Sequence, residues 1–317
     1  MRELADTALQ WAARHRTAVL ARPLTERGFG PRHPADALLV DADGNCHGTL
    51  YRGAFDRQLV AEAASLPPGH TSRVVPVAVH DEGVRDAGLT CGGQAEILLQ
   101  PLASLPARWW ELLAAGADAA LVTWLDEWRT HAVSAVVTRD GKADGPDVPP
   151  QAAECARALL VRHRAGREVH ATDAGLCLVE TCPAVPHLVV VGGGELAELL
   201  VAQAGLLGWQ ATVTGTARDA GKLLAERPAC ACLVMLSHEP DVDVPTLHTA
   251  LTSGIAYVGA LGSRHTQERR AAGLTAAGLG DDHLGRIHGP IGLDIGARTP
   301  AETAMAVCAE VLATLDR

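Results

Sequence analysis

The sequence predicts an α/β protein in which a mixed α+β amino-terminal domain precedes a parallel sheet with helices on both faces. Two observations predict this fold. From residue 187 onward, short apolar runs alternate with segments of helical spacing, which is typical of parallel β–α–β units. Before that point, the apolar runs are separated by turn residues such as Asp43-Gly44-Asn45. We place the boundary in the proline-containing segment 183–186, so the two domains are residues 1–183 and 184–317.

The amino-terminal domain is expected to combine helices with short strands. Helical spacing covers the ranges 1–16, 55–65, 106–115 and 151–163. The apolar runs expected to form strands are 17–21, 37–40, 74–79, 97–99, 119–124, 169–171 and 176–180. Residues 140–150, DGKADGPDVPP, break any regular pattern and predict an exposed loop.

The carboxyl-terminal domain alternates strictly. Strands are expected at 187–191, 211–214, 231–236 and 255–259, with helices at 195–206, 218–225, 245–252 and 264–277. A last helix is signalled by Thr299, Pro300 and Glu302, which form a capping box with a proline in the first turn. If the sheet is doubly wound, we expect its first and fourth strands to be neighbours, so that the loops following them face each other across one crevice.

Composition narrows the class of protein. Of 317 residues, 48% are hydrophobic and 20% charged, and the formal net charge of −10 argues against nucleic acid and anionic membranes as partners. No window approaches the roughly 18 apolar residues of a membrane helix, and the first residues lack the apolar core of a signal peptide. We therefore expect a cytoplasmic homo-oligomer whose eight cysteines are reduced thiols.

A glycine-rich turn follows the strand at 187–191. Residues 192–197, GGGELA, have the GxGxxA pattern between a strand and a helix, which favours a Rossmann-like, dinucleotide-type domain. Gly192 permits the tight turn, Gly194 lets a ligand approach the backbone, and the helix start suits a phosphate. The alternative, a turn that only joins strand to helix, is equally consistent with the pattern.

The end of the second strand lacks the carboxylate that holds the ribose of NAD. The segment there is Thr214-Gly215-Thr216-Ala217-Arg218, so Thr216, Arg218 and Lys222 are candidates to accept a 2′-phosphate. Any dinucleotide is then expected to be NADP. The alternative is that these residues simply begin a solvent-exposed helix.

Two later loops carry further candidates. Gly262, Ser263 and Arg264 precede a helix and make a second anion-friendly terminus. His238 follows the third strand and is a candidate catalytic acid or base, or a structural hydrogen-bonding group. Asp241 and Asp243 alone do not make a metal site, and we expect none.

The glycine-rich segment 287–298 and the cysteines complete the set of candidates. Asp294 either contacts a ligand or pairs with Arg298 to brace the loop. Cys91, in a Cys-Gly-Gly turn, is a candidate catalytic thiol. Cys155 and Cys308 fall within expected helices and should pack as small hydrophobes.

At these residues the sequence resembles the XdhC/CoxI family, accessory proteins of molybdenum hydroxylases such as xanthine dehydrogenase. The segments AYVGALGSRHTQERR and IHGPIGLDIGARTPAETAMAV carry the resemblance best, and CLVMLSHEPDVD supports it. It is traceable earlier in Gly30-Pro31-Arg32, Asp43-Gly44 and LTCGG at 89–93. Ala54 stands where the family has a cysteine, Glu195 where its glycine turn has a histidine, and Gly215-Thr216-Ala217 where it has an acidic DPR.

The resemblance implies a protein that binds molybdenum cofactor and helps to deliver it to a partner hydroxylase. Cys91 matches the family's cysteine, and its role there requires the two domains to close over the crevice between Gly194 and Gly262. The rival hypothesis is an NADP-dependent oxidoreductase acting on a small metabolite, so whether the protein is an enzyme stays open. A third is a family member that binds a partner without any cofactor.

Overall fold

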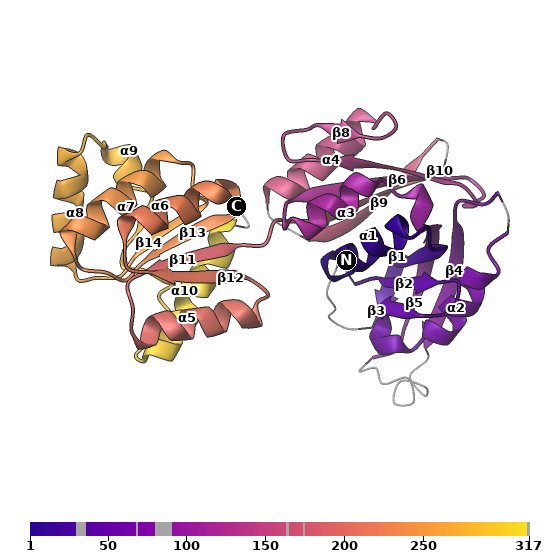
Figure 1. Cartoon of the computed structure of the whole chain (residues 1–317), viewed down its shortest axis with the longest axis horizontal. Helices are drawn as coiled ribbons and strands as arrows, with labels where there is room; N and C mark the ends of the chain where they lie inside the picture. The colour runs from indigo at the N-terminus through magenta and orange to yellow at the C-terminus, as the bar shows by residue number, and fades with distance from the viewer. Residues whose placement is uncertain (30–35, 68, 80–90, 163–164, 174, 316–317) are drawn as a thin grey trace. The chain divides into compact units, whose positions relative to one another are not determined.

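The computed structural model describes residues 1–29, 36–67, 69–79, 91–162, 165–173 and 175–315. The segments Gly30-Pro31-Arg32 and Leu89-Thr90, which contribute to the family resemblance, lie outside these residues. The chain forms two compact units, Met1–Ala184 (unit 1) and Val185–Arg317 (unit 2). Each is described separately (Figure 1).

Unit 1 contains two antiparallel five-stranded sheets. The first has the order β3-β2-β1-β5-β4 and the second β8-β7-β6-β10-β9. The strands of the first sheet are β1 (Ala18–Gly28), β2 (Leu38–Asp41), β3 (Cys46–Gly48), β4 (Arg73–Val79) and β5 (Gly93–Pro101). Those of the second are β6 (Ala119–Asp126), β7 (Ala132–Val137), β8 (Ala143–Asp144), β9 (Gly166–Thr172) and β10 (Gly175–Cys182).

Four α-helices belong to the described part of unit 1: α1 (Ala5–Ala13), α2 (Asp56–Ala64), α3 (Ala107–Ala114) and α4 (Pro150–Val161). Short 3₁₀ turns lie at Arg2–Leu4, Tyr51–Gly53 and Leu102–Ser104. The predicted helices agree with these within a few residues. The prediction missed β3 and β7, and β8 lies inside the expected loop 140–150. The strand β7 is defined by its pairing with β6, a contact that a local pattern does not contain.

A buried polar network joins the two sheets of unit 1. Arg22 of β1 is fully buried and its Nε lies 2.5 Å from Oε2 of Glu180 on β10. Its Nη2 donates to Oε1 of Gln100 on β5 at 2.7 Å and to Thr123 Oγ1 on β6 at 3.0 Å. Since an unpaired charge inside a protein is costly, this network fixes how the two sheets face each other.

Unit 2 is a parallel five-stranded sheet in the order β12-β11-β13-β14-β15. Its strands are β11 (His187–Val191), β12 (Gln210–Thr214), β13 (Ala231–Met235), β14 (Tyr257–Ala260) and β15 (Ile287–His288). The helices are α5 (Glu195–Leu206), α6 (Ala217–Glu226), α7 (Pro240–Thr252), α8 (Arg264–Ala276), α9 (Asp281–Leu284) and α10 (Pro300–Leu315), with a 3₁₀ turn at Pro228–Cys230.

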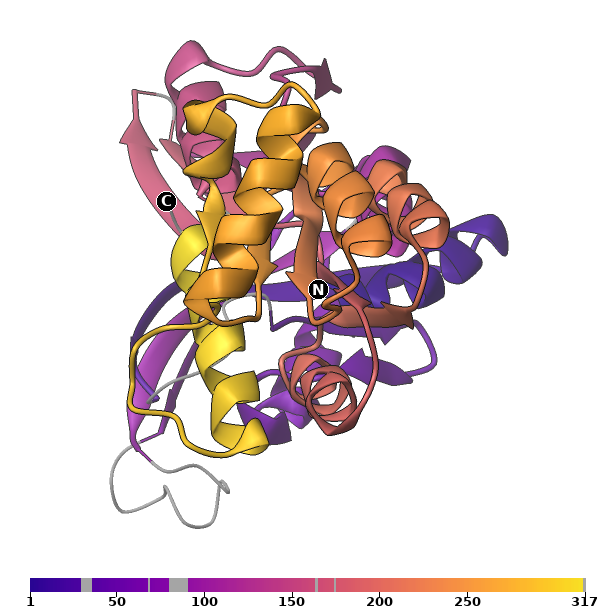
Figure 2. The same cartoon turned by 90° about the vertical axis from the view of Figure 1, so that its left-hand side faces the viewer.

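Helices cover both faces of this sheet, as the sequence predicts (Figures 1 and 2). Leu188 and Val190 of β11 pack in one core with residues of α5 and α10. Val189 and Val191, which point to the opposite face, pack in a second core with residues of α6, α7 and α8. A strand buried on both faces is apolar throughout, which explains the continuous run at 187–191.

The strand order corrects one prediction. The first strand, β11, lies between β12 and β13, and β13 separates it from the fourth strand, β14. The expectation that the first and fourth strands are neighbours is therefore wrong. The helices α5 and α7, which follow β11 and β13, lie on opposite faces, so the switch point is between these two strands. The helix α7 begins at Pro240 rather than at residue 245, and Pro245 lies inside it.

Candidate functional site

Three loops lie in sequence along the carboxyl ends of β11, β13 and β14, and we call them the loop cluster: residues 192–194, 236–239 and 261–263. Backbone hydrogen bonds hold them in this order. The N–H groups of Leu236 and Ser237 both donate to the Val191 carbonyl, at 2.8 and 2.9 Å. The N–H of Leu261 donates to the Met235 carbonyl at 2.8 Å. The switch point thus brings the glycine turn beside the His238 loop rather than beside Gly262.

The glycines at 192, 193 and 194 have different structural roles in the turn. Gly192 has a φ of 113°, and a Cβ there would lie 2.8 Å from the backbone nitrogen of Ser237. Only glycine therefore allows the second loop to approach so closely. Gly194, with a φ of 97°, precedes α5, and a Cβ at Gly193 or Gly194 would meet nothing within 4 Å. The space beside these two glycines is open, and the approach of a ligand to Gly194 stays a prediction.

A hollow of about 430 Å³ lies beside this turn, between α5 and β12. Its lining is apolar apart from one carboxylate and consists of Gly193, Gly194, Ala197, Glu198, Val201 and Val213. Glu195 is also exposed at the start of α5. Two carboxylates in the first helical turn oppose a phosphate there. The hollow therefore suits a weakly polar group better than an anion.

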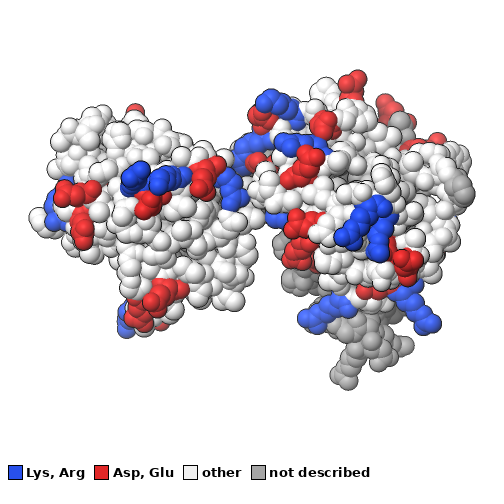
Figure 3. Space-filling view, viewed as in Figure 1, with Lys and Arg blue, Asp and Glu red and all other residues white. Residues whose placement is uncertain are grey.

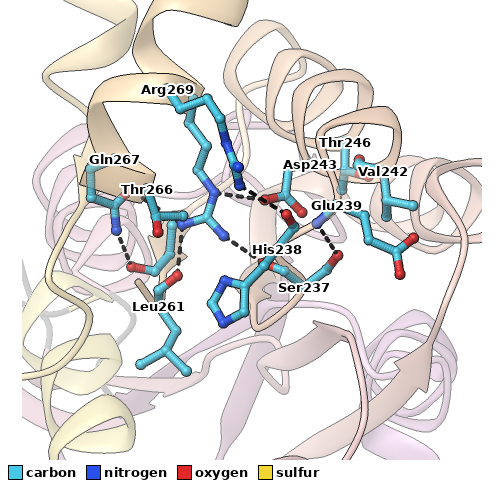
Figure 4. Close-up of polar contacts among 12 residues, drawn as sticks. Ser237, His238, Glu239, Val242, Asp243, Thr246, Leu261, Thr266, Gln267 and Arg269 are labelled. Carbon is cyan, nitrogen blue, oxygen red and sulfur yellow. Dashed lines mark hydrogen bonds and ion pairs between the residues drawn. The ribbon is translucent and has the colours of Figure 1, made fainter. Parts of the chain in front are cut away.

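Arg270 and Asp243 form a buried ion pair next to the other two loops. Figure 4 labels Asp243 together with Ser237 and Leu261 of those loops. Their exposed fractions are 2% and 1%, and Arg270 Nε donates to Asp243 Oδ2 at 2.8 Å. Arg270 also donates to the carbonyls of Leu261 at 2.7 Å and Ser237 at 2.6 Å. One guanidinium thus fastens both loops to α7 and α8.

The sequence analysis does not predict the ion pair between Arg270 and Asp243. Arg270 stands in the charged run QERR, which usually marks a solvated helix face. The signal was its spacing: it precedes the buried Leu274 by four residues and so lies on the buried side of α8.

His238 projects from the loop cluster without a ring partner. The residue is exposed, and its carbonyl accepts a hydrogen bond from Arg269 at 3.0 Å. Within the residues that the structure describes, neither ring nitrogen forms a hydrogen bond, and Figure 4 shows the imidazole pointing away from the neighbouring polar groups. The ring is therefore available to a ligand rather than engaged in the structure.

The loop after β14 ends in an anion-friendly helix start. Ser263 caps α8, accepting a hydrogen bond from the Thr266 N–H at 3.3 Å, and Arg264 is exposed beside it. Gly262 has a structural duty, because a Cβ there would lie 2.9 Å from Thr266 Cγ2. Of the predicted anion-binding residues here, Arg264 has its charge free to face solvent.

At the end of β12 the structure favours the plainer alternative. The Thr216 hydroxyl caps α6, accepting from the Asp219 N–H at 3.1 Å and donating to the Asp219 carboxylate at 2.9 Å. Lys222 pairs with the same carboxylate at 3.2 Å. These hydrogen bonds lower the pKa of Asp219. All three candidate side chains are exposed, but Thr216 and Lys222 are bound to Asp219, so Arg218 is the candidate left for a 2′-phosphate.

Asp294 and Arg298 are both exposed, and the structure of unit 2 as described contains no ion pair between them. Their loop is held from α10 instead: Gly292 N–H donates to Glu310 at 2.8 Å, and Leu293 N–H to the Ala306 carbonyl at 3.1 Å. The capping box is confirmed, with Thr299 N–H donating to Glu302 at 3.0 Å and Glu302 N–H to Thr299 Oγ1 at 3.2 Å.

The thiols divide by exposure. Cys91 is exposed in unit 1, directly before β5, and its catalytic role stays a prediction. All three cysteines of unit 2 (Cys230, Cys232 and Cys308) are buried. Burial raises the pKa of Cys308 to about 11, as expected for a packed, unreactive thiol. Unit 2 therefore offers its loop cluster no thiolate.

Comparison with known proteins places these loops in a family. Residues 188–311 match the profile described as the XdhC Rossmann domain, and residues 11–77 match that of the XdhC and CoxI family. The chain belongs to the XdhC and CoxI family. Within it, the chain is 30% identical over 145 residues to the Escherichia coli K12 protein "Uncharacterized protein YqeB", covering 40% of this chain and 27% of that one. The match thus spans about a quarter of that relative.

One solved structure is similar to this chain over almost its whole length. The crystal structure of a xanthine dehydrogenase from Bacillus halodurans aligns with a TM-score of 0.64 at 20% identity, covering 99% of this chain and 95% of that one. At this identity the likeness establishes a common fold. Both units of this XdhC and CoxI family member therefore have a counterpart in a known structure.

No helix among the described residues has the length and apolar character needed to cross a membrane. On the face shown in Figure 3, basic and acidic side chains are interspersed over the residues that the structure describes.

Proposed function

We propose that this chain is an XdhC-type accessory protein that binds molybdenum cofactor at the loop cluster and assists the maturation of a molybdenum hydroxylase. The family supports this role, and the name of the Bacillus halodurans structure points to a xanthine dehydrogenase-type partner. The observation that carries the proposal is the Arg270–Asp243 pair, which fixes the SHEPD and LGSR loops side by side. Both loops belong to segments that carry the family resemblance.

The residues present suit the phosphate-bearing pterin end of the cofactor. Arg264 is exposed at the start of α8, a helix of 13 residues whose first N–H groups also favour an anion. Glu195 and Glu198 oppose the phosphate at α5. We therefore assign the phosphate to Arg264 and the α8 terminus, and a contact with the cofactor to the His238 imidazole. Unit 2 supplies no exposed thiol for molybdenum. Cys91 of unit 1 matches the family's cysteine, and from that resemblance we propose that it contributes to the retention of the cofactor.

Binding of the cofactor tests this assignment. Purified protein would be incubated with molybdenum cofactor released from a donor enzyme, and bound pterin measured by fluorescence after oxidation. We expect Arg264→Ala to weaken binding by at least about tenfold, because a hydrogen bond to a charged group contributes about 1.5–3 kcal/mol. Arg227→Ala is the control. Arg227 ends α6 at the amino ends of the strands, whereas the loop cluster lies at their carboxyl ends. Equal binding by the natural protein and Arg264→Ala would refute the assignment.

The alternative function, an NADP-dependent oxidoreductase, is supported by one feature of the structure, the exposed Arg218. The same preparation decides between the two functions. Binding of NADP(H) in preference to NAD(H), lost in Arg218→Ala, together with no pterin binding, would replace the accessory role by the oxidoreductase.

A further inference from the structure

Three metal-ligating side chains meet on the surface of unit 1. Cys155 lies on α4, and Glu168 and His170 lie on β9. Cys155 Sγ is 3.2 Å from Glu168 Oε2 and 3.5 Å from His170 Nε2, and the last two atoms are 3.5 Å apart. Among the described residues of this protein, these form the one group of three such ligands within 4.8 Å of one another.

The fold builds this triad from two elements. Glu168 and His170 are two residues apart on a strand and therefore point to the same face. The helix α4 packs on that face through the buried Ala152, Ala156 and Leu160, which places Cys155 at its edge. Cys155 was expected to pack as a small hydrophobe, but it is only half-buried and its thiol donates to Glu168. A local sequence pattern does not indicate the triad, because Cys155 and Glu168 lie 13 positions apart on different elements.

The geometry matches a zinc ion. Zinc binds cysteine sulfur at about 2.3 Å and histidine nitrogen or carboxylate oxygen at about 2.0–2.2 Å. Tetrahedral bonds of these lengths separate neighbouring ligand atoms by roughly 3.4–3.6 Å, close to the three distances in the triad. We propose that Cys155, Glu168 and His170 form a zinc site with three protein ligands and a fourth position open to solvent. Glu168 and His170 have side chains 47% and 46% exposed, so that position is accessible.

The charges also balance. A thiolate and a carboxylate neutralise Zn²⁺, and the imidazole binds as a neutral ligand. On binding, the S–H bond of Cys155 breaks, its proton leaves to solvent and a zinc–sulfur bond forms. No oxidant or reductant is required.

A nucleophilic Cys155 is the competing interpretation, because a histidine lies beside the thiol. Glu168 argues against it. The Cys155 thiol donates its hydrogen bond to Glu168 Oε2 at 3.2 Å, and a carboxylate in contact with the sulfur disfavours the thiolate that a nucleophile requires.

Cobalt titration of the metal-free full-length protein tests the site, because Co²⁺ bound to a thiolate gives a charge-transfer absorption band. We expect one such cobalt per chain, displaced by zinc. Cys155→Ser should abolish the band, and Glu168→Gln and His170→Gln should each weaken cobalt binding by at least about tenfold. Cys46→Ser, which removes an exposed thiol of the same unit, should change nothing.

A second measurement covers the case in which Cys155→Ser folds poorly. Zinc should raise the melting temperature of the natural protein and of Cys46→Ser, but not of Glu168→Gln or His170→Gln, whose side chains are half-exposed. Absence of the cobalt band in the natural protein, or a band that survives in Cys155→Ser, would overturn the proposal. No pterin is involved, so the result is independent of the cofactor assignment above.

Discussion

Arg270 shows how a single residue holds a functional surface in place. Its guanidinium lies between two helices. Because both Arg270 and Asp243 are buried, water does not replace the hydrogen bonds between them. The guanidinium also donates hydrogen bonds to the carbonyls of Ser237 and Leu261, which belong to different loops. The exposed His238 on one of these loops, and Arg264 at the helix start that follows the other, are therefore held by one buried side chain.

We expect Arg270→Ala to destabilise the protein by about 3–5 kcal/mol, because it leaves the Asp243 carboxylate buried without its partner. Urea unfolding followed by circular dichroism would measure this. Arg269→Ala is the matched control: Arg269 is exposed and its neighbour in sequence, and its loss should cost about 0.5 kcal/mol or less. Equal effects of the two substitutions would contradict the role given to the buried pair.

Residue roles were predictable where both partners lie close in sequence. Thr299 and Glu302 are three residues apart, and their capping box forms as predicted. Thr216 is a candidate to accept a ligand phosphate, and its hydroxyl caps its own helix, in line with the alternative that it begins an exposed helix. Asp243 and Arg270 are 27 residues apart, and only the packing of α7 on α8 brings them together.

At the scale of elements, the alternating strands and helices of unit 2 were predictable because each strand is buried on both faces. The strand at 187–191 and the helix at 195–206 have the predicted bounds. The order of the strands was not predictable in the same way. Each crossover helix is long enough to return to either side of β11, and the choice depends on hydrogen bonds between strands distant in sequence. The neighbour of the glycine turn was therefore misassigned.

Substitutions in the glycine turn can separate two effects: strain in the backbone and steric blocking of the hollow beside the turn. Gly193→Trp should leave the stability unchanged and block the adjacent hollow, because no atom lies within 4 Å of its Cβ position and its φ is not positive. Gly194→Trp should block it too, but lose about 1–3 kcal/mol, because φ of 97° with ψ of −177° is a backbone conformation that essentially only glycine adopts. Thermal melts and cofactor titration would measure both effects.

Gly205→Trp is the control for bulk alone, since Gly205 lies at the far end of α5 with equally open space. The turn would be removed from the proposed site by unchanged cofactor affinity in both Gly193→Trp and Gly194→Trp. A large loss of stability in Gly193→Trp would instead show that the backbone there is not free.

At the scale of the whole molecule, the two units have separate cores. Every residue of the two cores that sandwich the parallel sheet lies between Leu188 and Leu315. The cores of unit 1 draw only on residues before Ala184. A boundary near residue 184 is readable from the sequence because prolines at 183 and 186 interrupt both patterns.

We therefore expect the fragment 185–317 to fold alone, with a single cooperative unfolding transition and a stability of about 5–15 kcal/mol, as is usual for a domain of this size. Since Arg264, His238 and the Arg270–Asp243 pair all lie in it, the fragment should bind the pterin end of the cofactor. In the full chain, Cys91→Ser should reduce retention of cofactor without lowering the melting temperature, because the thiol is exposed. If the fragment retains cofactor as well as the full chain does, and Cys91→Ser has no effect, unit 1 contributes no thiol to the site. If the fragment fails to fold, the two cores depend on each other despite their separate residues.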